Sequence, residues 1–265
     1  MENKIRIGAL ISGGGTNLQA IIDACEEGRI DGRMVFVGSD VAGVRGLERA
    51  EKHGIPSFVV DYRDVIRRYR EDAGQVPPPD DFDLNELLSK QALFNSESDP
   101  DKARAFLTTR AVAESLLLSQ IEPYAVDLLV LAGFMRNLTP YFIDRFNPDA
   151  QRPRIMNIHP ALLPSFPGVD GYGDTFRYGC KVGGCTVHFI DYGEDSGPII
   201  GQKAFSIQEG DDLDVVKKKG LELEWQLYPE CIQLFAQRRL HVVTMTHSLD
   251  NGQIIQRKVV RIARR

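Results

Sequence analysis

The chain has 265 residues, of which 43% are hydrophobic and 26% charged, and its formal net charge is −5. These values are typical of a globular protein with one large domain or two small ones, and the acidic balance excludes a whole-chain basic footprint for nucleic acid. No apolar run approaches the roughly 20 residues that a membrane span needs. The four cysteines, Cys25, Cys180, Cys185 and Cys231, have no CxxC spacing, which favours a reduced cytoplasmic protein.

The first 62 residues alternate between strand-like and helix-like runs. Short β-type runs predict strands at 4–11, 33–40 and 56–62, and apolar residues at helical spacing predict helices at 18–30 and 44–54. This alternation is typical of a parallel sheet with crossover helices.

The turn between the first strand and the first helix is rich in glycine and reads SGGGTN. Glycines let backbone N–H groups approach an anion, and a helix N-terminus adds about half a positive charge. We therefore expect a phosphate or carboxylate seat at Gly15, Thr16 and Asn17, with a simple turn as the alternative. No Walker A lysine follows, and Leu18 stands where a dinucleotide fingerprint has its third glycine. Asp40, beyond the second strand, keeps a nucleotide-binding oxidoreductase as a minor alternative.

Residues 64–107 differ in character, because they are highly charged and include a triple proline. This composition predicts an insertion with short helices and an exposed proline-rich turn. Such an insertion is either a lid or interface element, or a decoration of the surface.

The α/β alternation then resumes. A near-continuous apolar run at 125–135 is typical of a strand in the middle of a parallel sheet. The other expected elements are a helix at 109–121, a short helix at 140–146, a strand at 154–160, a loop with a short helix at 160–179, strands at 184–190 and 197–207, a helix at about 212–237, and a hairpin at about 240–265 that turns at Asp250-Asn251-Gly252.

Two polar residues close the strand at 154–160. Side chains of a strand alternate between its faces, so Asn157 and His159 point the same way, and Pro160 ends the strand because it cannot donate to a ladder. Ligands of open α/β sheets gather at the carboxyl ends of strands. There Asn157 could donate to a developing oxyanion and His159 could move a proton. An ordinary capped strand end is the alternative interpretation.

A neighbouring carboxylate would fix the tautomer of His159. Asp195 lies in a loop just before an apolar strand, with Ser-Gly-Pro after it, which indicates a tight bend. Asp191 and Glu194 compete for the same role, and the residues alone do not choose among the three acids.

Four stretches resemble the 10-formyltetrahydrofolate-dependent formyltransferases: LISGGGTNLQAII, VLAGFMRNLTP, MNIHPALLPSFPG and GCTVHFIDYGEDSGPII, in this order. The glycine loop is similar to that of the branch acting on glycinamide ribonucleotide. The resemblance covers most of the chain outside 64–107 and the C-terminal hairpin. It implies one domain over 1–265 with the formyltransferase fold, a Rossmann-like, mostly parallel twisted sheet with helices on both faces.

The resemblance also implies roles for individual residues. Gly15, Thr16 and Asn17 match the loop that holds the substrate phosphate, and Glu224 matches a glutamate that contacts the glycinamide substrate. For the folate it implies contacts from Arg110, Met135, Arg136, Asn137, Leu138 and Asn157. The implied catalytic trio is Asn157, His159 and Asp195, which selects Asp195 among the three acids.

The sequence departs from the family pattern in two places. VDGYGD stands where the family usually has histidines after the FPG motif, and Leu221 replaces a frequent Lys or Gln. Lys219 or the insertion could compensate for Leu221. His188 lies in a matching segment and is expected to support the site from its strand rather than to act in catalysis.

The implied reaction is formyl transfer from 10-formyltetrahydrofolate, as co-substrate, to the amine of glycinamide ribonucleotide in purine biosynthesis. No metal is expected, because no ligand cluster with metal spacing is present. The expected partners are these two small molecules and no nucleic acid or membrane, with the protein a cytoplasmic monomer or homodimer. One alternative is a formyltetrahydrofolate hydrolase, although such enzymes usually carry an N-terminal regulatory domain and this chain begins at the first strand. The other is a catalytically silent folate- or nucleotide-binding regulator.

Overall fold

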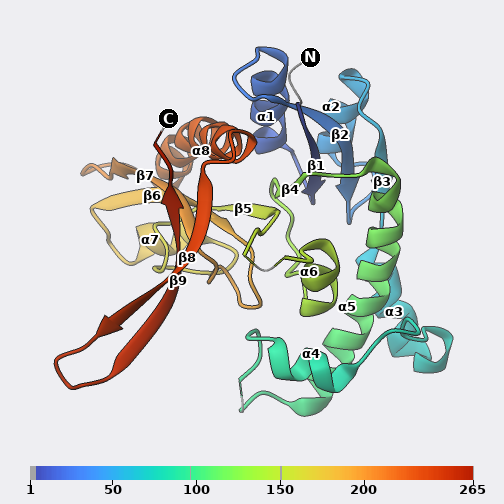
Figure 1. Ribbon diagram of the computed structural model, residues 1–265. Helices are drawn as coiled ribbons and strands as arrows, with labels where there is room; N and C mark the ends of the chain where they lie inside the picture. Colours follow the sequence, from blue (N-terminus) through green and yellow to red (C-terminus); the bar gives the residue numbers. More distant parts are fainter. Residues whose placement is uncertain (1–3, 96, 150, 265) are drawn as a thin grey trace.

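A computed structural model describes residues 4–95, 97–149 and 151–264. The expected domain limits at 1–3 and 265, together with residues 96 and 150, lie outside the described residues. The body is a seven-stranded sheet with helices on both faces, followed by a separate two-stranded hairpin (Figure 1). The expected α/β fold with a C-terminal hairpin is confirmed.

The strands of the body are β1 (Ile5–Ile11), β2 (Gly32–Ser39), β3 (Ser57–Val59), β4 (Leu128–Leu131), β5 (Ile155–His159), β6 (Val182–Phe189) and β7 (Ile199–Ser206). The hairpin consists of β8 (Leu240–Ser248) and β9 (Ile254–Ile262). The helices are α1 (Thr16–Glu26), α2 (Arg45–Lys52), α3 (Tyr62–Glu71), α4 (Leu84–Lys90), α5 (Pro100–Ile121), α6 (Pro140–Phe146), α7 (Gly171–Arg177) and α8 (Leu213–Ala236), with single 3-10 turns η1 (Ala73–Gln75) and η2 (Glu122–Tyr124).

The strand order is β3-β2-β1-β4-β5-β6-β7. The first five strands in this order are parallel, whereas β6 pairs antiparallel with both β5 and β7. The carboxyl ends of β1, β4 and β5 therefore lie at one edge of the sheet, which is where ligands of such folds bind.

Strand residues alternate between two apolar cores, one on each face of the sheet. In β4, Leu128 and Val130 pack with α1 and α8, whereas Leu129 and Leu131 pack with α5 and α6. This arrangement explains the near-continuous apolar run of β4, because both of its faces are covered.

Helix α5 begins earlier than the expected residue 109. The side chain of Asp99 accepts hydrogen bonds from the backbone N–H groups of Asp101 and Lys102, and Pro100 occupies the first turn, where its missing N–H costs nothing. Residues 100–107 of the expected insertion therefore continue directly into a helix of the body. Its buried residue Leu107 packs on Tyr141 and Leu87 in a small separate core.

The segment before α5 contacts the loop that follows β6. The Ala92 N–H donates to the carbonyl of Tyr192 at 2.9 Å. The Tyr192 hydroxyl donates to Asp144 of α6 at 2.5 Å, and Nζ of Lys90 lies 2.8 Å from the other oxygen of Asp144. The charged segment is thus attached to the loop that also carries Asp195.

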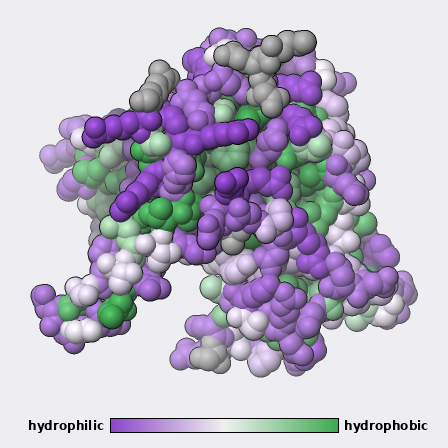
Figure 2. Space-filling view, in the orientation of Figure 1, coloured by the Kyte–Doolittle hydropathy of each residue, from purple (hydrophilic) through white to green (hydrophobic). Residues whose placement is uncertain are grey.

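The hairpin β8–β9 projects away from the body (Figure 1). It is antiparallel from Leu240↔Ile262 to Ser248↔Ile254 and closes through the expected Asp-Asn-Gly turn, with Gly252 at φ 81°. Figure 2 shows apolar surface at its far end, and Leu249 and Ile254 are both exposed. Among the described residues, the helices are too short or too polar to cross a membrane.

Candidate active site

A cavity of about 510 Å³ opens at the carboxyl edge of the parallel strands. Its walls include the ends of β4 and β5, the loop before α7, the loop after β6, and one face of α8. Ten of the expected site residues line it: Asn17, Arg110, Met135, Arg136, Asn137, Leu138, Asn157, His159, Asp195 and Glu224. Gly15 and Thr16 are not part of the wall, but they directly precede Asn17 at the start of α1.

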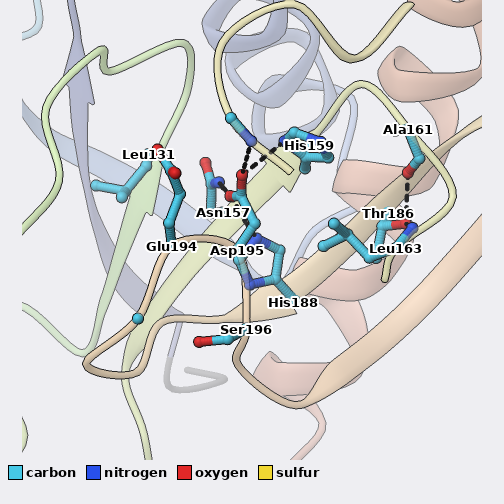
Figure 3. Close-up of polar contacts among 12 residues, drawn as sticks. Leu131, Asn157, His159, Ala161, Leu163, Thr186, His188, Glu194, Asp195 and Ser196 are labelled. Carbon is cyan, nitrogen blue, oxygen red and sulfur yellow. Dashed lines mark hydrogen bonds and ion pairs between the residues drawn. The ribbon is translucent and has the colours of Figure 1, made fainter. Parts of the chain in front are cut away.

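Three side chains converge on the carboxylate of Asp195 (Figure 3). Its Oδ2 lies 3.1 Å from Nδ1 of His159, and its Oδ1 lies 3.5 Å from both Nε2 of His188 and Nδ2 of Asn157. The backbone N–H of Gly168 donates to Oδ2 at 2.9 Å. The structure thus brings Asn157, His159 and Asp195 together.

The acid beside His159 is Asp195, and the two competing acids have other contacts. Asp191 accepts from the hydroxyl of Ser196 at 2.6 Å, and Glu194 accepts from Asn137 at 3.3 Å. Of the three acids, the structure therefore places Asp195 next to the His159 ring.

The environment of Asp195 favours its ionised form. Burial alone raises the pKa of this carboxyl, but the hydrogen bonds from His188 and the Gly168 N–H, with the charges of His159 and His188, outweigh burial and lower the pKa below its ordinary 3.8. A carboxylate is therefore present beside the imidazole throughout the neutral pH range.

Both nitrogens of the His159 ring face oxygen acceptors. Nδ1 faces Asp195, and Nε2 lies 2.7 Å from the carbonyl oxygen of Phe166. A neutral ring donates from only one nitrogen, so the doubly protonated imidazolium is the form that satisfies both contacts. His159 is 2% exposed, which leaves little water to compete with either bond.

His188 supports the trio from the neighbouring strand. It lies opposite Asn157 in the antiparallel β5–β6 pair and is fully buried. Its Nδ1 lies 2.9 Å from the carbonyl of Phe189, and its Nε2 lies 3.3 Å from the Asn157 amide nitrogen. Since its Nε2 donates to Asp195, His188 holds the carboxylate of this trio and does not accept from the Asn157 amide.

The glycine turn brings the N-terminus of α1 to the same cavity. Gly15 adopts φ 67°, and a Cβ there would lie 2.8 Å from Cα of Gly46, so both conformation and space require glycine. The turn therefore has a structural reason in addition to any anion. No side chain of the described residues caps α1, so the N–H groups of its first turn remain available to an anion.

Glu224 is the buried acid of α8. It is 4% exposed, and its two oxygens accept hydrogen bonds from Asn17 Nδ2 and from the Tyr172 hydroxyl, each at 2.6 Å. Burial raises the pKa of Glu224, and the two hydrogen bonds oppose this rise. The contact with Asn17 joins this acid to the glycine turn.

Arg110 projects from α5 into the cavity wall. Its guanidinium lies 5.1 Å from the ring centre of Tyr62 and 4.7 Å from that of Phe106. Among residues 4–95, 97–149 and 151–264, no hydrogen-bond partner meets its buried Nε and Nη1 atoms. Burial lowers the pKa of this guanidinium. A buried cation with two unused donors is suited to an anionic or carbonyl group of a ligand.

The segment Met135–Leu138 forms the wall next to Arg110. Leu138 is buried, Met135 is exposed, and the Asn137 amide reaches Glu194. Arg136 pairs with Asp40 at 2.5 Å.

Two alternatives raised by the sequence do not agree with the structure. The carboxylate of Asp40 accepts hydrogen bonds from the Ser12 hydroxyl and from Arg136. Asp40 does not line the cavity, so it is not placed to bind a ribose there, as the nucleotide-binding alternative requires. Lys219 does not replace the missing side chain at Leu221, because it pairs with Asp211 at 2.5 Å outside the cavity.

Lys217 and Tyr172 are among the cavity residues that the sequence did not indicate. Lys217 lies one turn before Leu221 on the face of α8 that also carries Glu224, so helical spacing back from Glu224 would have indicated it. Tyr172 lies within the divergent VDGYGD stretch, and nothing in the sequence pattern indicates its contact with Glu224. Among the described residues, no group of three or more His, Cys, Asp or Glu side chains could hold a metal ion.

Fold and cavity together define a Rossmann-like α/β protein with a polar cavity at the carboxyl edge of its parallel strands. The chain belongs to the formyl transferase family, whose model matches residues 5–232.

Individual relatives agree with this assignment. The chain is 34% identical over 245 residues to phosphoribosylglycinamide formyltransferase of Haemophilus influenzae, an alignment that covers 92% of the chain and 93% of the relative. It is 32% identical over 240 residues, or 91% of its length, to the trifunctional purine biosynthetic protein adenosine-3 of Gallus gallus, and this match spans only 19% of that larger protein. The crystal structure of glycinamide ribonucleotide transformylase 1 from Symbiobacterium toebii superposes with a TM-score of 0.69 at 36% identity, covering 98% of this chain and 94% of that one.

Proposed function

We propose that this protein transfers a formyl group from 10-formyltetrahydrofolate to the primary amine of glycinamide ribonucleotide in purine biosynthesis. One observation carries the proposal: a single cavity holds the Asn157, His159 and Asp195 side chains together with the Asn17–Glu224 pair beside the glycine turn. Relatives named for this activity, aligned over nearly their whole length, support it.

The reaction requires two ligands to meet in this cavity. The folate supplies the formyl group: a bond forms between the substrate amine and the formyl carbon, the bond from that carbon to the folate nitrogen breaks, and the amine proton passes to the folate nitrogen. Holding both ligands in one cavity converts a bimolecular step into an intramolecular one, which can contribute roughly 7–11 kcal/mol.

Asn157 and His159 stabilise the oxygen of the formyl group as it gains negative charge. The Asn157 amide nitrogen carries two hydrogens, of which one faces Asp195 at 3.5 Å. His188 donates to Asp195 and does not accept the other, so a donor remains for the substrate. The imidazolium of His159 adds positive charge and a proton, while Asp195 holds the ring. The formyl oxygen has to replace the Phe166 carbonyl as the partner of His159 Nε2 before it can accept this hydrogen bond.

The glycine turn and α8 hold glycinamide ribonucleotide. The backbone N–H groups at Gly15, Thr16 and Asn17 bind its phosphate at the positive end of α1. A carboxylate has no hydrogen bond to accept from an ionised phosphate. Oε2 of Glu224 lies 2.6 Å from Nδ2 of Asn17, so Glu224 accepts hydrogen bonds from hydroxyl or amine groups next to that phosphate.

The other end of the cavity suits the folate. The two unpartnered donors of Arg110 fit a carboxylate of the folate tail, and the Met135–Leu138 segment with Arg136 and Asn137 borders its ring system.

We also propose a cellular location, a domain organisation and an oligomeric state for this protein. We place it in the cytoplasm, where its four free cysteines stay reduced, and we expect one domain over 1–265 that acts as a monomer or homodimer.

The test is a direct assay. Purified protein is mixed with 10-formyltetrahydrofolate and glycinamide ribonucleotide, and tetrahydrofolate absorbance and formate release are followed together. Tetrahydrofolate formation that depends on the ribonucleotide and releases no formate supports the proposal. Formate release without the ribonucleotide would establish the hydrolase instead, and ligand binding without turnover would establish a silent regulator.

A further inference from the structure

Tyr172 is a cavity residue to which neither the reaction nor the family motif gives a role. It lies in α7 and is 5% exposed, and its hydroxyl donates to Oε1 of Glu224 at 2.6 Å. The other oxygen, Oε2, accepts from Asn17 at the same distance. Glu224 is therefore held from both sides, by α1 and by α7.

Gly220 makes room for Tyr172. It lies inside α8, one turn before Glu224, and a Cβ there would lie 2.1 Å from Cζ and 2.4 Å from the hydroxyl oxygen of Tyr172. Glycine is unfavourable inside a helix relative to alanine, and Gly220 has no positive φ that would require it. Its small size is thus what allows the Tyr172 ring to reach Glu224.

We propose that Tyr172, seated over Gly220, is a positioning residue that holds the Glu224 carboxylate toward the glycinamide ribonucleotide and keeps it an acceptor. This inference rests on the proposed function, since it assigns Glu224 to that substrate. It also gives the divergent VDGYGD stretch a role at the ribonucleotide end of the cavity.

The physical reason is the cost of burying a carboxylate. Burial raises the pKa of Glu224, and the donors Asn17 and Tyr172 lower it again. Cys185 of β6 and Tyr228 of α8 also lie close enough to interact with Glu224, and both are buried. Lys217 lines the same cavity from the same helix. Without the Tyr172 hydroxyl, one carboxylate oxygen loses its partner, and protonation of Glu224 converts an acceptor for substrate donors into a donor.

The main test compares Tyr172→Phe with Tyr178→Phe, because Tyr178 directly follows the same helix but is 80% exposed. Calorimetry measures the Kd of glycinamide ribonucleotide and of the folate separately, over a range of pH. Tyr172→Phe should weaken ribonucleotide binding about tenfold, as expected for one lost bond to a charged group. The Kd of the folate should not change, and the acid limb of ribonucleotide binding should move to higher pH. Tyr178→Phe should match the wild-type protein.

A second variant tests the steric part and remains informative if Tyr172→Phe does not fold. Gly220→Ala keeps the hydroxyl but displaces the ring, so it should weaken ribonucleotide binding in the same selective way. Lys218→Ala, an exposed change in the same helix, should not. In a Tyr172→Ala background, Gly220→Ala should cost no further affinity, because the added methyl group no longer meets a ring.

The outcomes separate this inference from the proposed function. Unchanged ribonucleotide Kd and pH dependence in Tyr172→Phe or Gly220→Ala overturn the positioning role while transferase activity stands. A wild-type protein that binds no ribonucleotide overturns both. A wild-type protein that binds it without formyl transfer overturns the proposed reaction, and the variants still decide the role of Tyr172.

Discussion

The Oδ2 atom of Asp195 lies 3.1 Å from Nδ1 of His159. Asp195 reaches this position with φ 50°, in the left-handed region that few residues other than glycine adopt. Three contacts hold it there, from the N–H of Gly168 and from the side chains of His188 and Asn157. An unfavourable backbone conformation kept in place by surrounding polar contacts is a frequent property of functional sites.

Asp195→Asn removes the negative charge of this side chain and keeps its shape. Asparagine tolerates the left-handed conformation, and its amide oxygen can still accept from the Gly168 N–H, so the loop should persist. Without the negative charge the imidazolium of His159 loses its partner, and kcat should fall by about 10²–10⁴-fold. Steady-state kinetics with both substrates measure this fall, with Asp191→Asn as the matched control. A kcat close to that of the wild-type protein would remove Asp195 from the mechanism.

Much of the fold could be predicted because its signals are local. Apolar runs such as that of β4 and helical spacing such as that of α1 depend on near neighbours in the sequence, and so does the Asp-Asn-Gly turn of the hairpin. The start of α5 was predicted too late, because the charged sequence around Pro100 obscured the cap that Asp99 provides. The short β3 was predicted too long, because the Asp61 side chain caps α3 and ends the strand region.

The site could be predicted only in part. Strand alternation and the carboxyl-end rule indicate that Asn157 and His159 point into one cavity. The choice of Asp195 needed either a family resemblance or coordinates, since three acids lie within five residues of one another. The Tyr172–Glu224 contact spans 52 positions and depends on the space above Gly220. Such a contact is a property of packing, and no periodicity in the sequence records it.

Glu114 should make stability fall as pH rises. This carboxyl is fully buried in α5, and burial raises its pKa from 4.5 to about 8, against the hydrogen bonds it accepts from the backbone N–H and hydroxyl of Thr139. A pKa raised on folding stabilises the fold fully below pH 4.5, and this contribution is lost as the pH rises to 8. Glu114→Gln cannot ionise, and its amide can keep both contacts because the Thr139 hydroxyl can also accept. Urea melts at pH 5 and pH 8.5 should show a smaller loss of unfolding free energy in the variant, and equal losses would contradict the assignment.

Arg110→Met should weaken the binding of 10-formyltetrahydrofolate without lowering the stability of the fold. Arg110 is 8% exposed, and within the described part of the chain its Nε and Nη1 donors have no partner, so the guanidinium is costly in the free protein and useful only to a ligand. Methionine fills a similar space against Tyr62 and Phe106. We expect Tm to stay the same or rise, and the KM for 10-formyltetrahydrofolate to rise at least about tenfold with no change for the ribonucleotide. Arg104→Met, an exposed change in the same helix, is the control. A lower Tm with an unchanged KM would make Arg110 a structural residue.

Asp144→Ala should decide whether the charged segment before α5 serves the site. Asp144 accepts from Tyr192 in the Asp195 loop and from Lys90, so one change breaks both contacts. Loss of two partly exposed bonds should cost about 1–2 kcal/mol of stability. If the segment braces the loop, hydrogen exchange at 191–196 should also accelerate and kcat should fall severalfold, whereas the exposed change Asp80→Ala should alter neither. Lower stability with unchanged exchange and kcat would identify the segment as a decoration of the surface, because its contacts would then stabilise the fold without holding Asp195 beside His159.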